Sequence, residues 1–231
     1  MPAGEVLVGY IMAEEKPKTI KLRDGEFLNA AEGGEVVRSA PSSVVVVAGM
    51  ARSGKTTLVG ELYGLFHKGS FAGYLFAGSR TLPGFERRCH LSRLCSEREI
   101  PATERTLFSE SHDLLHLRLA SVANGIHRDI LFSDIYGEDF RLASDSAEEC
   151  RKISIFKRAN HVVILVDGKK AIDKGERQAA FSAADSLLRQ CLDCGMLGEK
   201  SNVQIVVTKW DKAAGHGDAF ECVAMLHRAS V

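Results

Sequence analysis

Residues 42–58, "SSVVVVAGMARSGKTTL", carry the clearest indication of the fold of this chain. A run of valines, Val44–Val47, is typical of a buried parallel strand, and a glycine-rich turn follows it directly. After the turn, Leu58 and Leu62 recur at helical spacing. The stretch therefore predicts a strand, a tight loop and a helix in that order, which is the context in which a GxxxxGK[ST] pattern cradles phosphate.

In such a loop the backbone N–H groups turn toward phosphate oxygens, a lysine places its charge on the terminal phosphates, and a hydroxyl ligates magnesium. Lys55 and Thr56 are expected in the last two roles. The nucleotide contacts predicted from the loop are Gly49, Arg52, Ser53, Gly54, Lys55, Thr56 and Thr57. Arg52 leaves two readings open: it offsets transition-state charge along the phosphates, or it points to solvent. We favour the second reading.

The amino-acid composition limits the classes of protein to which the chain can belong. The chain has 231 residues, of which 45% are hydrophobic, enough for the core of one α/β domain or of a domain with a small appendage. Thirty basic and thirty acidic residues give no net charge, so nothing favours a nucleic acid or a membrane as partner. No signal peptide or membrane-spanning stretch is recognised, and the six cysteines are expected to be reduced thiols. We expect a cytoplasmic protein.

The rest of the chain extends the α/β pattern. Residues 1–40 read as short extended pieces, which predicts a small β annex ahead of a main domain at residues 41–231. In the main domain, strand-like runs alternate with helical patterns, so we expect a mostly parallel sheet with helices on both faces. The runs are "VVVVAG", "GYLFAGS", "LLHLRLAS", "DILFSD", "HVVILVD" and "NVQIVVTK". Residues 79–112 are polar and poorly periodic, which is typical of a long functional loop.

Two further motifs follow predicted strands. "DILFSDIYGED" places Asp134 at the end of a strand and Gly137 three residues later. A carboxylate at that point can hold magnesium, and the glycine N–H can sense a γ-phosphate. "NVQIVVTKWD" ends with Thr208, Lys209 and Asp211. A carboxylate there can accept hydrogen bonds from guanine that adenine does not offer, which favours a guanine nucleotide.

The order GMARSGKT, DIYG and TKWD resembles the GTPases of the translation-factor and Ras-like superclass over about residues 43–213. More narrowly, the chain is similar to the bacterial double-GTPase families around residues 55–90 and 115–140. The resemblance implies a P-loop α/β fold that binds GTP or GDP with Mg²⁺. It also implies a companion GTPase or effector as protein partner, in a multicomponent system related to defence.

Three departures from that pattern affect hydrolysis and the base pocket. Glu138 occupies the position at which many small GTPases carry a glutamine that positions water. In one reading Glu138 supports slow hydrolysis together with Lys55 and Gly137. In the other it only begins the next helix, where its charge favours the helix N-terminus. The magnesium-binding switch threonine is expected to be Thr103, with Thr106 as the alternative. The sequence ends about twenty residues after Asp211, so we expect either a truncated chain or a pocket that is open on that side.

A zinc site is a weak alternative for the cysteines. Cys191 and Cys194 have metal-ligand spacing, and Cys89, His90 and Cys95 offer further donors. The stronger reading makes Cys191 part of the apolar stripe of a helix at about residues 172–192. His112 and His116 lie on one face of a predicted strand without a third ligand.

The leading hypothesis is a GTP-binding switch that hydrolyses GTP slowly and contacts a protein partner. The alternative is a pseudo-GTPase that serves as a scaffold for a companion. A third reading, an ATP-dependent enzyme, requires TKWD to be a coincidence. The oligomeric state is left open.

Overall fold

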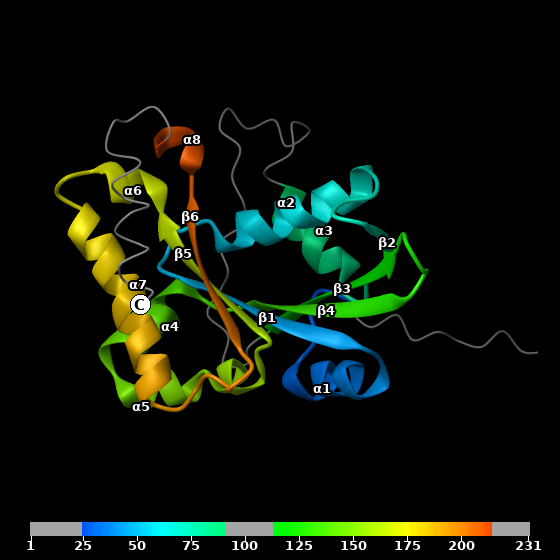
Figure 1. The fold of residues 1–231 in the computed structure, drawn as a ribbon, viewed down its shortest axis with the longest axis horizontal. Helices are drawn as coiled ribbons and strands as arrows, with labels where there is room; N and C mark the ends of the chain where they lie inside the picture. The colour runs from blue at the N-terminus through cyan, green and yellow to red at the C-terminus, as the bar shows by residue number, and fades with distance from the viewer. Residues whose placement is uncertain (1–24, 91–112, 214–231) are drawn as a thin grey trace, which may run out of the picture.

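The computed structural model describes residues 25–90 and 113–213 (Figure 1). Six strands form one sheet in the order β2-β3-β4-β1-β5-β6. They are β1 (Ser42–Gly49), β2 (Tyr74–Gly78), β3 (Asp113–Ser121), β4 (His127–Asp134), β5 (His161–Asp167) and β6 (Asn202–Thr208). β1 is parallel to β4 and β5, and β5 is parallel to β6, whereas β3 is antiparallel to β2 and β4. The predicted mostly parallel sheet is confirmed, with antiparallel pairing confined to one side.

Helices cover both faces of the sheet, as the sequence predicts (Figure 1). α2 (Lys55–Lys68) and α3 (Leu82–His90) pack on one face. The other face carries α1 (Ala30–Ser39), α4 (Gly137–Asp145), α5 (Ala147–Lys152), the 3-10 helix η2 (Ser154–Arg158) and α7 (Arg177–Asp193). Two short helices, α6 (Gly168–Ile172) and α8 (Trp210–Ala213), follow β5 and β6. None of the helices within the described residues has the length and apolar character needed to cross a bilayer.

The sheet separates the hydrophobic core into two layers, and its central strand β1 contributes side chains to both. Successive side chains of a strand point to opposite faces, so Val47 packs toward α2 and α3 while Val46 packs toward α4 and α7. On the first side the rings of Tyr63 and Phe85 stack with centroids 4.8 Å apart. This double burial explains why the β1 sequence is a continuous apolar run rather than an alternating one.

The segment before β1 differs from the expectation of extended pieces. Residues 30–39 form α1, and only Leu28 pairs with the sheet, through a bridge to Leu114. The helix forms because Asn29 and Glu32 make a reciprocal capping box: the Asn29 side chain accepts from the N–H groups of Ala31 and Glu32, and the Glu32 carboxylate accepts from Asn29 N–H. The expectation is therefore wrong for these residues, and residues 1–24 lie outside the described part.

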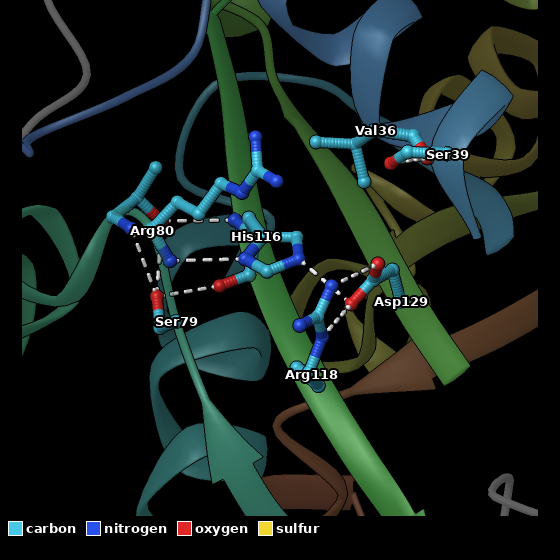
Figure 2. A network of polar contacts seen from close by, with 8 residues as sticks. Val36, Ser39, Ser79, Arg80, His116, Arg118 and Asp129 are labelled. Carbon is cyan, nitrogen blue, oxygen red and sulfur yellow. Dashed lines mark hydrogen bonds and ion pairs between the residues drawn. The ribbon is translucent and has the colours of Figure 1, made fainter. Parts of the chain in front are cut away.

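A buried polar network fixes the loop that leads from β2 to α3 (Figure 2). Arg80 N–H donates to Nδ1 of His116 at 2.9 Å, so the other ring nitrogen, Nε2, carries the hydrogen and donates to Asp129 Oδ1 at 3.1 Å. Arg118 donates to both oxygens of Asp129, at 2.7 and 2.8 Å. The backbone of His116 binds the hydroxyls of Ser79 and Thr81. The start of the predicted functional loop is thus anchored to β3 and β4.

Candidate nucleotide-binding site

The loop between β1 and α2 has the backbone that the glycine-rich motif requires. Gly49 and Gly54 have φ angles of 151° and 92°, values that side chains with a Cβ rarely adopt. A Cβ on Gly49 would lie 2.7 Å from Ser53 Oγ and 3.0 Å from the carbonyl oxygen of Leu165. Arg52 also has a left-handed φ, 64°, and its side chain is exposed. The loop is therefore tightly folded against β5 and leads directly into the first turn of α2.

Lys55 is held inside this loop by its carbonyl groups. Its Nζ donates to Gly49 C=O at 2.8 Å and to Met50 C=O at 3.1 Å, and it lies 5.6 Å from the centroid of the Phe140 ring. Thr56 is half-buried and Thr57 is exposed in the same turn of α2. The ammonium group is thus positioned by the backbone carbonyls of the loop.

The second motif lies directly against the first. Asp134 is the last residue of β4, beside β1 in the sheet, and Gly137 begins α4. A Cβ on Gly137 would lie 2.6 Å from Ala51 N and 2.9 Å from Lys55 Nζ. Backbone atoms cannot give way as a flexible side chain can, so only glycine permits α4 to approach the loop this closely. The structure therefore brings Gly137 and Lys55 together.

The third motif is tied to the loop by hydrogen bonds. Thr208 Oγ1 donates to Ser53 C=O at 2.7 Å, and Lys209 Nζ donates to Arg52 C=O at 2.9 Å. Lys209 Nζ also lies 2.5 Å from Oδ2 of Asp167. The Asp167 carboxylate is buried and caps α6 by accepting from Lys169 N–H at 3.0 Å. All three motifs therefore converge on the loop at the carboxyl ends of β1, β4 and β6.

Asp167 is the residue of this site that the sequence analysis missed. The sequence feature that could have identified Asp167 is the one used for Asp134: a carboxylate at the end of an apolar strand. Beyond Lys209, the side chains of Trp210 and Asp211 are exposed, and Asp211 is within 3.4 Å of Lys212 Nζ. Thr208 and Lys209 of the TKWD motif thus hold the loop through hydrogen bonds, whereas the side chains of Trp210 and Asp211 are exposed.

Glu138 lies in the first turn of α4, where a negative charge favours the helix N-terminus. Its Oε2 accepts a hydrogen bond from Arg141 Nε at 3.0 Å, one turn along the same helix. This geometry matches the structural reading of Glu138. Thr103 and Thr106, the two candidates for the switch threonine, lie outside the described residues.

Among the described residues, Cys89 and Cys191 do not come together as the zinc alternative requires, and Cys95 lies outside the described part. Cys89 packs on the α2 and α3 face of the sheet, whereas Cys191 lies on the opposite face with its Sγ 3.8 Å from that of Cys150. Burial raises the pKa of the Cys150 and Cys191 thiols, which keeps them neutral. Within the described ranges no group of three His, Cys, Asp or Glu side chains is arranged to hold a metal ion. His116 is paired with Asp129 instead.

Comparison with known proteins agrees with this geometry. A search of curated proteins found no match to the chain. The family model described as Double-GTPase 2 matches residues 43–229, a range that includes the phosphate loop, Gly137 and Asp211. This range begins in β1 and takes in all three motifs that converge on the loop, so the match covers the whole candidate site. The chain therefore belongs to the Double-GTPase 2 family.

Proposed function

We propose that this protein binds GTP and GDP with Mg²⁺, hydrolyses GTP slowly, and acts as a molecular switch for a protein partner. The observation that carries the proposal is the convergence of the three motifs on one loop. Gly137 lies against Ala51 and Lys55, while Thr208 and Lys209 bind the loop carbonyls. Membership in a GTPase family supports the same chemistry.

The loop residues fit a nucleotide phosphate. The backbone at Gly49 and Gly54 folds the loop tightly, and Lys55 brings a positive charge into it. Ser53 Oγ is buried and has no hydrogen-bond partner among the described residues, so it is suited to a polar ligand group. In the proposed complex, loop N–H groups and Lys55 bind the phosphates, with Arg52, Thr56 and Thr57 at the edge of the loop.

Thr56 and Asp134 would hold the magnesium ion, because hydroxyl and carboxylate oxygens are the ligands that Mg²⁺ prefers. Thr103 is the proposed further ligand. A bound Mg²⁺ neutralises negative charge on the phosphates. The residues of this chain then position the γ-phosphate: Lys55 from the loop and Gly137 N–H from the start of α4.

Base selection is assigned to the third motif. Thr208 and Lys209 join the loop to β6, and the Asp211 carboxylate, two residues further along, is exposed. The Lys209 stem is proposed to lie along the guanine base, while Asp211 accepts from guanine N–H groups. Asp167 acts through Lys209, whose ammonium it holds.

We propose slow hydrolysis because Glu138 is engaged with Arg141 on its own helix. A carboxylate in that pair is a poor substitute for an amide that orients water beside anionic phosphates. The same observation supports the second candidate function, a scaffold that binds nucleotide without turnover for a companion GTPase or effector. In either role, we propose that the protein works in a bacterial multicomponent system related to defence, which is what the family resemblance implies.

The switch itself is assigned to the segment after Gly137. α4, α5 and η2 follow one another over residues 137–158, so a displacement of Gly137 by the γ-phosphate passes directly to two further helices. We propose that residues 134–158 and 79–112 rearrange between the GDP and GTP states; residues 91–112 of the second segment lie outside the described part. Such a switch moves only as far as the two nucleotides differ in affinity for the two conformations.

The decisive experiment titrates the purified protein with fluorescent GDP, a GTP analogue and ATP, with and without Mg²⁺. Binding selective for guanine, dependent on Mg²⁺ and lost in Lys55→Ala supports the proposal; Lys174→Ala, an exposed lysine between α6 and α7, is the matched control. Asp211→Asn is expected to shift the preference toward xanthine nucleotides. Binding of ATP as tight as that of GTP, or no binding of any nucleotide, would overturn the proposed function. GTP turnover measured on the same samples separates the switch from the scaffold.

A further inference from the structure

A cavity of about 500 Å³ lies between α1 and the segment formed by α5 and η2. Figure 1 shows these elements on the same face of the sheet. Its floor is apolar and consists of Val44, Leu114 and Leu131 from three adjacent strands, with Ile155 at the side. None of its lining residues belongs to the phosphate loop, to Gly137 or to the TKWD motif. The cavity is therefore separate from the proposed nucleotide site.

The sequence of α1 creates this cavity. Ala30, Gly33 and Gly34 lie on one face of the helix and present almost no side chain toward the space. At Gly33 the helix approaches the sheet so closely that a Cβ would lie 2.5 Å from Leu114 Cδ1. At Gly34 a Cβ would meet only the Arg38 guanidinium, at 3.3 Å. The helix is thus held against the sheet at one glycine and leaves room beside the next.

Three basic side chains line the cavity and no acidic one does: Arg38, Lys152 and Arg158. Lys152 pairs with Glu149 on its own helix. In the part of the chain that the structure describes, neither Arg38 nor Arg158 has a carboxylate within ion-pair distance. An apolar floor with arginines at the rim is complementary to a molecule that has an apolar body and an anionic head.

We propose that this cavity binds a small amphipathic anion, specifically a medium-chain acyl carboxylate. The chain would lie on Val44, Leu114 and Leu131, and the carboxylate would pair with Arg38 and Arg158. The volume lies in the range of about 300–1,000 Å³ that is typical of small-molecule sites. A docked peptide is less suited, because peptides bind along extended grooves or sheet edges with repeated side-chain pockets. This proposal does not depend on the proposed GTPase activity.

Calorimetric titration of the full chain with decanoate, decanol and butyrate tests the proposal. Decanoate is expected to bind at one site, about tenfold or more tightly than either decanol, which lacks the charge, or butyrate, which lacks the chain. Gly34→Leu fills the cavity and is expected to abolish decanoate binding. Gly64→Leu is the matched control, because Gly64 lies in α2 with nothing within 4 Å of its added Cβ.

A second pair of variants tests the head group without filling the cavity. Arg38→Gln with Arg158→Gln is expected to reduce decanoate affinity to that of decanol, while Arg151→Gln, an exposed arginine of α5 outside the lining, leaves it unchanged. Decanoate binding that does not saturate, or that survives Gly34→Leu, would overturn the proposal. So would a peptide of alternating leucine and glutamate that displaces decanoate and binds more tightly, since it would assign the cavity to a protein partner.

Discussion

Lys209 Nζ lies 2.5 Å from Asp167 Oδ2, and the same ammonium group donates to the backbone carbonyl of Arg52 at 2.9 Å. One cation therefore joins the ends of β5 and β6 to the phosphate loop. Asp167 in turn caps α6 through the N–H of Lys169. The TKWD motif and the loop between β1 and α2 thus form a single hydrogen-bonded unit.

Lys209→Met is expected to lower the free energy of unfolding by about 1–3 kcal/mol, because the buried Asp167 carboxylate loses its cationic partner. Methionine keeps most of the aliphatic part of the lysine side chain, so the loss of stability reports on the removed positive charge. Urea unfolding checks the value, with Lys174→Met as the control at an exposed position. Equal stability of the two variants would show that the ion pair contributes nothing, as many exposed pairs do.

Gly137→Ala is expected to weaken binding of a GTP analogue by about tenfold or more while the protein stays folded. The added Cβ would lie 2.6 Å from Ala51 N, so α4 must move away from the phosphate loop. Fluorescent nucleotide titration measures the loss, and circular dichroism checks the fold. An unchanged affinity would mean that α4 does not contact the bound nucleotide.

Two glycines of α2 are expected to respond to alanine in opposite directions. Gly64→Ala is expected to stabilise the protein by up to about 1 kcal/mol, since nothing lies within 4 Å of the added Cβ and alanine is the better helix former. Gly60→Ala is expected to destabilise it by about 1–3 kcal/mol, because the Cβ would lie 2.7 Å from Cys89 Sγ. Denaturant unfolding measures both. The combination of Gly60→Ala with Cys89→Ala should recover part of the loss, and no recovery would assign the cost to another contact.

Stability is expected to fall as the pH drops below about 6.5, the ordinary pKa of histidine. Burial lowers the pKa of His116 in spite of the nearby Asp129 carboxylate, and the charges of Arg80 and Arg118 lower it further. The unfolded chain therefore binds a proton at a pH where the folded chain does not, so the stabilisation is complete above pH 6.5 and is lost on acidification.

The slope from this single group is at most about 1.4 kcal/mol per pH unit. Urea unfolding between pH 5 and pH 8 measures it, and His116→Gln, which does not titrate, should flatten the dependence in this window. Asp129 acts only at lower pH: burial opposes its ionisation, but Arg118 and His116 outweigh that effect and lower its pKa. A slope identical in the variant would assign the pH dependence to other groups.

The strands and motifs were predictable because each depends on residues that are adjacent in the chain. Every strand-like run is a strand, and the loop from Gly49 to Gly54 follows β1 as expected. α1 was missed because the pair Gly33 and Gly34 reads as a turn. Its available signal was the capping box of Asn29 and Glu32, a pattern of short range.

Local sequence patterns alone were enough to predict the α/β class, the six strands and the glycine-rich loop between β1 and α2. The tertiary structure decided which groups meet across the sheet. Asp167 and Lys209 are 42 residues apart in the chain, and their contact depends on the pairing of β5 with β6. The cavity beside α1 likewise depends on how closely Gly33 allows that helix to pack. Contacts of this kind are set by strand order, register and packing distance, none of which a local pattern specifies.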